Sequence, residues 1–185
     1  MEEKVPGLLL QVIPYLGQKK ILKVFTPEGL VSLFAKSTPL TPFCLAEWVY
    51  RKTDTEMHPL LDTTLLDPLS ELRQNYSVIS AAGAMAKDLL RSQLPGKKAP
   101  ALYQLASLYF RKLPAAPATL VASFRLKLLL HEGLLSPDRE PSFTTTEWTQ
   151  VIALASARQL SSLFELTSLP LEKIALLFEE RLLHN

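Results

Sequence analysis

The first part of the chain alternates short apolar runs with turn-forming residues. The runs predict strands over residues 7–16, 20–25, 30–36, 43–52 and 60–66. They are rich in β-branched and aromatic residues, and Gly17, Pro27 and Gly29 mark tight turns between them. About five short strands within about seventy residues are typical of an OB-fold, a small and partly open β-barrel. The sequence therefore predicts an OB-fold domain over residues 1–67.

The pattern changes at Asp67-Pro68, where alanine and leucine become dominant and apolar positions recur with a helical period. A capping box from Thr144 to Glu147 marks one helix start, and Gly133 marks a helix end. Helices are predicted over 68–94 (as one helix or two), 99–113, 118–130, from 144 onward with a continuation over 160–167, and from 170 to 183. The expected fold class is α+β, with the barrel followed by an all-helical domain over residues 68–185.

Composition fits a packed globular protein rather than a disordered or membrane-spanning one. The chain has 185 residues, of which 48% are hydrophobic and 21% charged. No apolar run reaches the roughly 18 residues of a spanning helix, and the N-terminus has no signal-peptide pattern. We therefore expect a cytoplasmic protein that does not associate with a membrane.

Basic residues are distributed unevenly. Residues 1–75 hold eight Lys and Arg against nine Asp and Glu, whereas residues 87–127 hold eight basic residues and one acid, Asp88. Such a stretch suits a polyanion or an acidic peptide, and it equally suits a solvated surface. Charge alone leaves both interpretations open.

No pattern of residues predicts catalysis. The single cysteine, Cys44, excludes an intramolecular disulfide and a cysteine-based zinc site, and we expect it to be a small buried apolar residue. The phosphate-loop spacing, a second histidine four residues after His131, and a GxSxG motif are all missing. The chain is expected to be a binding protein rather than an enzyme, with no catalytic residues, no metal and no cofactor.

Candidate residues for nucleic acid are those that neutralise phosphates or stack on bases. The basic candidates are Lys19, Lys20, Lys23, Lys36, Arg51, Lys52, Lys97 and Lys98. Trp48 and Tyr50 are possible stacking platforms, but they share one face of a strand, and we favour packing on the inner face.

Several segments, taken in order, resemble the bacterial recombination mediator family RecO. They lie at 7–10, 15–17, 22–29, 35–36, 40–43, 124–137 and 171–183. The resemblance implies an OB-fold followed by a helical domain, binding of single- and double-stranded DNA, and annealing of complementary strands. It also implies binding of the acidic C-terminal tail of single-stranded-DNA-binding protein and, with the partner RecR, loading of RecA recombinase.

An acidic tail that ends in an apolar residue needs a hydrophobic pocket with cations at its rim. The peptide-binding candidates in the helical part are Arg111, Lys112, Arg125 and Lys127. Arg125 and Lys127 are two positions apart and cannot point the same way on a helix, so we favour Arg125.

The sequence departs from the family pattern in three places. Residues 138–166 contain none of the four zinc-binding cysteines of many members, Ser37-Thr38-Pro39 stands in place of a basic cluster, and the basic C-terminal tail has no counterpart. We therefore expect DNA affinity to be lower or shifted to the helical domain. The alternative function is a protein–protein scaffold of the same architecture with little or no DNA binding.

Overall fold

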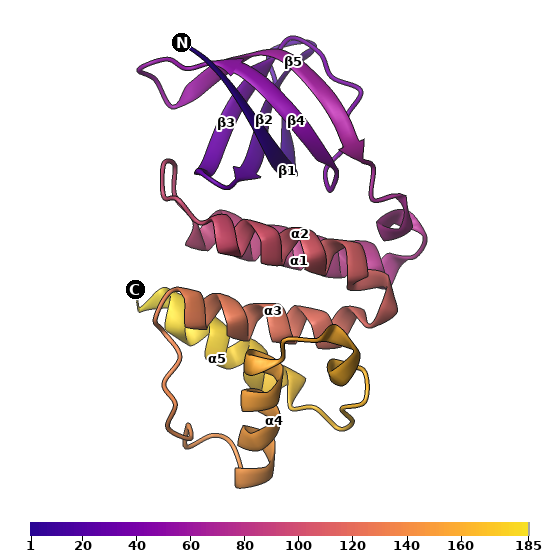
Figure 1. Cartoon of the computed structure of the whole chain (residues 1–185), viewed down its shortest axis with the longest axis vertical. Coiled ribbons are helices and arrows are strands. Elements are labelled where there is room, and N and C mark those ends of the chain that lie inside the picture. The colour runs from indigo at the N-terminus through magenta and orange to yellow at the C-terminus, as the bar shows by residue number, and fades with distance from the viewer. Residues whose placement is uncertain (185) are drawn as a thin grey trace. The chain divides into compact units, whose positions relative to one another are not determined.

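The computed structural model describes residues 1–184, which form five strands followed by helices (Figure 1). The strands are β1 (Glu2–Tyr15), β2 (Lys19–Thr26), β3 (Gly29–Ala35), β4 (Leu45–Arg51) and β5 (Met57–Asp67). The α-helices are α1 (Tyr76–Ser92), α2 (Pro100–Lys112), α3 (Pro117–His131), α4 (Thr145–Ser156) and α5 (Leu171–Leu183), and the 3-10 helices are η1 (Ser70–Arg73), η2 (Leu113–Ala115) and η3 (Leu160–Leu163). The predicted fold class, an OB-fold barrel followed by helices, is confirmed.

The barrel closes in the strand order β1-β2-β3-β5-β4, and only the β3–β5 pair is parallel. β1 pairs with two strands: its first half pairs with β4 and its second half with β2. The register with β2 shifts between Leu9 and Gln11, and such a bulge bends a strand. One long strand can therefore contribute to both sides of the barrel.

The barrel interior is apolar and contains the two aromatic residues of β4. Trp48 is fully buried, and its Nε1 donates a hydrogen bond to the carbonyl oxygen of Gly7 at 3.1 Å. Tyr50 and Cys44 are also buried in this core. Packing, rather than base stacking, is therefore confirmed for Trp48 and Tyr50, and so is the buried position of Cys44.

The helical region differs from the prediction at two places. Of the one helix or two predicted over 68–94, the first turn is the short 3-10 helix η1, and α1 begins at Tyr76, where the Asn75 side chain accepts a hydrogen bond from the Val78 amide at 3.0 Å. The predicted continuation over 160–167 is wrong, because α4 ends at Ser156 and Ala157 has an extended backbone (φ −56°, ψ 125°). The capping box between Thr144 and Glu147 is confirmed.

The residues group into two compact units, Met1–Arg111 and Lys112–Asn185. In the first, the α1–α2 loop binds the β2–β3 turn: the Leu30 amide donates to the Leu94 carbonyl at 3.3 Å and the Ala99 amide to the Pro27 carbonyl at 3.0 Å. The barrel therefore forms one unit with α1 and α2. Its last strand ends at Asp67, the boundary that the sequence suggests, but independent folding of residues 1–67 stays a prediction.

No helix in the part of the chain that the structure describes combines the length and apolar character needed to cross a bilayer.

Candidate nucleic-acid interface

An apolar row crosses the outer face of β1, β2 and β3. Cross-strand register aligns Ile13 with Ile21, and Ile21 with Phe34. Leu22 and Leu33 point into the barrel core, and because successive side chains alternate along a strand, Ile21 and Phe34 point outward. All three residues of the row are half-buried, so their apolar surface is open to a ligand.

Tyr15 and Lys19 border this row and approach Phe34. The rings of Tyr15 and Phe34 meet edge to face, with centroids 6.0 Å apart and an interplanar angle of 81°. Lys19 Nζ lies 5.7 Å from the centroid of the Phe34 ring, which is the distance range of a cation–π contact. Tyr15 keeps 40% of its surface exposed. Two accessible rings beside an ammonium group combine the two elements of single-strand recognition, base stacking and phosphate neutralisation.

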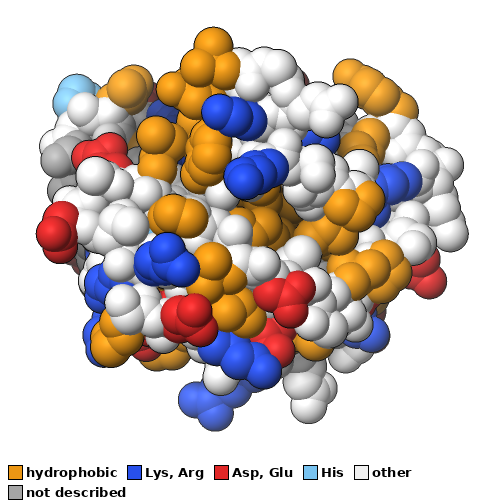
Figure 2. Space-filling model, turned by 90° about the horizontal axis from the view of Figure 1, so that it is seen from above, with side chains coloured by type: hydrophobic (Ala, Val, Ile, Leu, Met, Phe, Trp, Pro, Cys, Tyr) orange, Lys and Arg blue, Asp and Glu red, His pale blue; other side chains and the backbone are white. Residues whose placement is uncertain are grey.

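Lys23 and Lys36 extend the basic edge of this face, whereas Lys20 has the same parity as core residue Leu22 and lies on the other side of β2. Lys23 Nζ donates a hydrogen bond to Ser32 Oγ at 2.7 Å, and Lys20 Nζ donates to the Thr38 carbonyl at 3.2 Å. Lys36 directly follows β3 and is exposed. The structure therefore brings three of the predicted DNA-binding residues to this face: Lys19, Lys23 and Lys36. Figure 2 shows hydrophobic side chains interspersed with basic and acidic side chains in the view from above.

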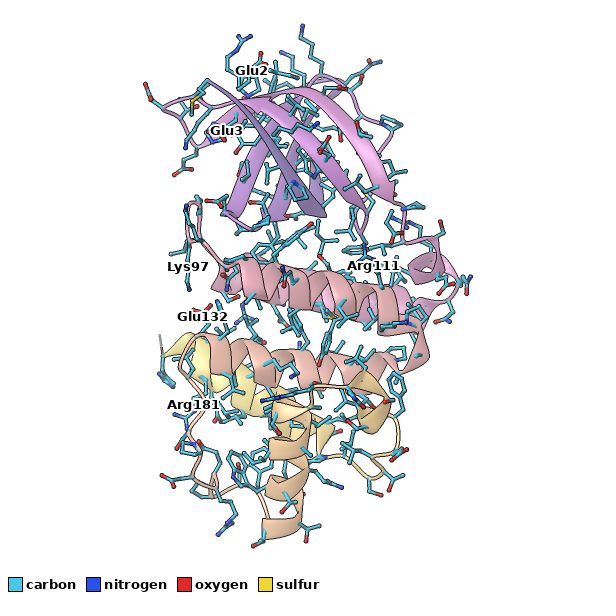
Figure 3. All side chains as sticks on the ribbon, in the orientation of Figure 1. Glu2, Glu3, Lys97, Arg111, Glu132 and Arg181 are labelled. Atoms are coloured by element: carbon cyan, nitrogen blue, oxygen red, sulfur yellow. The ribbon has the colours of Figure 1, made fainter. Side chains whose placement is uncertain are left out.

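Two of the other DNA-binding candidates, Arg51 and Lys98, lie beside acidic residues. Arg51 lies across from Glu2 at the start of β1, and Lys52 follows it (Figure 3). In the α1–α2 loop, Lys98 forms an ion pair with Glu28 at 3.0 Å. Nearby carboxylates reduce the positive potential that attracts phosphate, so Arg51 and Lys98 are weaker phosphate contacts, and a role of Lys52 and Lys97 in DNA binding stays a prediction.

Within the first unit, two basic residues of the 87–127 stretch are far apart. Lys97 and Arg111 lie at opposite ends of α2 (Figure 3), a 13-residue helix that spans about 20 Å. Arg111 Nε donates to Asp67 Oδ2 at 3.1 Å. Lys112 begins the second unit and is exposed.

Within the second unit, Arg125 and Lys127 have different surroundings. The Arg125 guanidinium lies 5.3 Å from the centroid of the Phe178 ring. Lys127 Nζ donates to the Ala157 carbonyl at the end of α4 at 2.7 Å, and burial lowers the pKa of this lysine. Lys127 thus has a structural contact, and a role for either residue in peptide binding stays a prediction.

The sequence did not identify the apolar and aromatic part of this face. Phe34 lies in a continuous apolar run, and its outward direction follows only once Leu33 and Ala35 are placed in the core. Tyr15 lies in the strand predicted over residues 7–16, but its pairing with Lys19 across the turn was not predicted. The period of two along β2 was the available signal, because it places Lys19, Ile21 and Lys23 on one face.

Within residues 1–184, no three His, Cys, Asp or Glu residues group as metal ligands.

No family model matches the chain. The chain is similar to "DNA repair protein RecO" of Chlamydia muridarum, with 30% identity over 146 residues, or 73% of this chain and 62% of the relative. Its identity with the protein of the same name from Chlamydia trachomatis serovar L2 is 28% over 157 residues, covering 79% and 65%. With that of Chlamydia pneumoniae it is 29% over 146 residues, covering 73% and 58%. The chain thus spans less than two thirds of the length of these relatives.

Proposed function

The chain belongs to the RecO family of DNA repair proteins, and from this premise we propose that it binds single-stranded DNA on the outer face of β1, β2 and β3. It acts as a non-enzymatic mediator of repair and recombination. The observation that supports this most directly is the cluster of Tyr15, Phe34 and Lys19, which offers ring surfaces and a cation at one place.

The chemistry of this face favours unpaired bases. Stacking of a base on an aromatic side chain contributes about 1–3 kcal/mol, and the base planes of a duplex are already stacked on each other. Lys19, Lys23 and Lys36 add contacts to phosphates, which are independent of sequence. The face should therefore prefer single strands over duplexes and show little sequence specificity, as strand annealing requires.

Further partners follow from family membership and are part of this proposal. They are double-stranded DNA, the acidic tail of single-stranded-DNA-binding protein, and RecR, with which the protein helps to load RecA in the cytoplasm. For the acidic tail, the candidates are Arg111, Lys112, Arg125 and Lys127, and at least two of them have other contacts in the folded chain. Arg111 forms an ion pair with Asp67, and Lys127 donates to the Ala157 carbonyl at the end of α4.

A fluorescence anisotropy titration with a labelled single-stranded oligonucleotide tests the DNA proposal. The logarithm of the binding constant should fall linearly with the logarithm of salt concentration, with a slope of about −0.7 per phosphate contact. Phe34→Ala should weaken binding roughly fivefold or more with an unchanged slope, whereas Lys19→Gln should make the slope shallower.

Matched controls are Tyr76→Ala and Lys87→Gln, which alter an exposed aromatic residue and an exposed lysine on α1. Both should leave binding unchanged. Full affinity in Phe34→Ala would contradict the assignment of this face. Binding of the tail peptide without any DNA binding at low salt would instead establish the protein–protein scaffold.

A further inference from the structure

β5 differs from the other strands of the barrel in its exposure. Each of β1 to β4 buries four residues, whereas none of the eleven residues of β5 is buried. Leu61, Leu65 and Leu66 are 41%, 46% and 58% exposed. The register with β4 skips Leu61 and Leu66, which are therefore extra residues at bulges. Single exposed leucines are common, but several on one strand indicate an interaction surface.

One edge of β5 is also free along most of the strand. β4 pairs with β5 from Leu60 to Asp67, whereas the ladder with β3 covers only Met57 to Pro59. Beyond Pro59, no second strand pairs with β5 in the described part of the chain. Unpaired N–H and C=O groups along such an edge are a template for an added strand. Figure 1 shows β5 running along the flank of the barrel toward the segment that leads to η1.

The charge of this strand indicates what can bind to it. No Lys or Arg occurs between Lys52 and Arg73, whereas the acids in that interval are Asp54, Glu56, Asp62, Asp67 and Glu71. Asp62 is exposed in the middle of β5 and raises the pKa of Lys4 through its negative charge, although less than Glu47 does. An acidic strand repels phosphates and attracts cations. The molecule that binds to β5 is therefore a basic protein segment and not a nucleic acid.

A second copy of this chain does not fit the same edge. Its basic strand, β2, already pairs with β1 and β3 along both edges. Two β5 edges side by side would bring like charges such as Asp62 together, which is destabilising. These observations favour a segment from a different protein.

We propose that the free edge of β5 docks an extended segment of a partner protein in which Lys or Arg alternates with apolar residues. The segment adds to the barrel as a further strand. Its backbone pairs with residues 60–67, its apolar side chains cover Leu61, Leu65 and Leu66, and one of its cations meets Asp62. This site is separate from the DNA-binding face proposed for β1, β2 and β3, and it can be tested independently of DNA binding.

An NMR titration of the ¹⁵N-labelled full chain with an eight-residue peptide of alternating lysine and valine tests the proposal. The amides of residues 60–67 should shift, and their hydrogen exchange should slow. The same peptide with every second amide N-methylated, prepared in both registers, should bind more weakly in one of them because it cannot complete the ladder. A peptide of alternating glutamate and valine should not bind.

Variants of the chain test the charge and apolar contributions. Asp62→Lys should weaken binding of the lysine–valine peptide about fivefold, and Leu65→Ser should also weaken it. The control Glu172→Lys makes the same charge change on exposed α5 and should have no effect. The dispersion of the amide spectrum shows whether each variant is folded.

Four results would overturn the proposal. They are peptide shifts that map away from β5, equal binding of both N-methylated peptides and the parent, unchanged affinity in Asp62→Lys, and no shifts up to about 1 mM peptide. A single-stranded oligonucleotide that shifts β5 rather than the face around Phe34 would overturn both this proposal and the DNA-binding assignment. Failure of only one of the two titrations would reject only the corresponding site.

Discussion

Asp67, the last residue of β5, accepts a hydrogen bond on Oδ2 from Nε of Arg111, near the end of α2, at 3.1 Å. Its Oδ1 accepts a second hydrogen bond from the Leu69 amide at 2.9 Å. The pKa of Asp67 is lowered, first by the Leu69 amide and then by Arg111. A single carboxylate therefore connects the end of the barrel both to the following segment and to α2.

Asp67→Ala should destabilise the protein more than Arg111→Ala. The aspartate variant loses both hydrogen bonds and should cost about 2 kcal/mol, whereas a partly exposed ion pair contributes about 1 kcal/mol or less. Urea unfolding of both single variants and the double variant measures the coupling. Asp54→Ala removes an exposed carboxylate from the preceding loop and should change stability little. Equal losses in the two single variants would show that the Leu69 hydrogen bond contributes nothing.

The same carboxylate should make stability sensitive to acid. Because the pKa of Asp67 is lower in the folded state, the unfolded chain binds the proton more readily. The stabilisation is fully present above the unfolded pKa of about 4 and is lost as pH falls through the folded value. Thermal melting between about pH 6 and pH 2 should therefore show a shallower decline for Asp67→Asn than for the unaltered chain. Parallel curves would contradict this role of Asp67.

The sequence predicted the features that depend on local pattern. Turn formers and apolar runs predicted the barrel, and the spacing from Thr144 to Glu147 predicted a helix start. The two-residue spacing of Trp48 and Tyr50 correctly favoured packing in the core. These features follow from strand alternation and capping chemistry, which involve residues close in the chain.

Features that depend on distant residues were not predictable. The Asp67–Arg111 pair joins residues 44 positions apart, and the approach of Lys19 to Phe34 depends on the register of β2 with β3. A count of charges cannot show that Lys98 pairs with Glu28, or that Lys97 and Arg111 lie at opposite ends of one helix. The candidate interface therefore required the three-dimensional arrangement.

Gly29 should tolerate no side chain. It has a φ of 111°, and a Cβ atom there would lie 2.8 Å from the Lys97 amide nitrogen and 2.9 Å from the Leu94 carbonyl oxygen. Both neighbours are backbone atoms of the α1–α2 loop. Gly29→Ala should therefore cost about 2–3 kcal/mol, measured by urea unfolding.

Gly83 provides the matched control for this substitution. It lies within α1, and a Cβ atom there meets nothing within 4 Å. Gly83→Ala should stabilise the protein by about 0.5–1 kcal/mol, because alanine loses less backbone entropy in a helix than glycine does. Equal effects of the two substitutions would show that the β2–β3 turn does not need its close contact with the α1–α2 loop.

The Cys44 thiol should report opening of the barrel. Burial raises its pKa to about 11, and the reactive form of cysteine is the thiolate. At pH 8 only about one thiol in a thousand is ionised, and the side chain is enclosed by the barrel core.

Labelling of Cys44 by a thiol reagent should therefore be slow in the folded protein and fast in urea. Gly29→Ala should accelerate labelling of the folded protein about tenfold for each 1.4 kcal/mol of stability that it loses, and Gly83→Ala should slow it. A labelling rate in the folded protein that matches the urea-unfolded rate would place Cys44 outside the core and contradict the barrel packing.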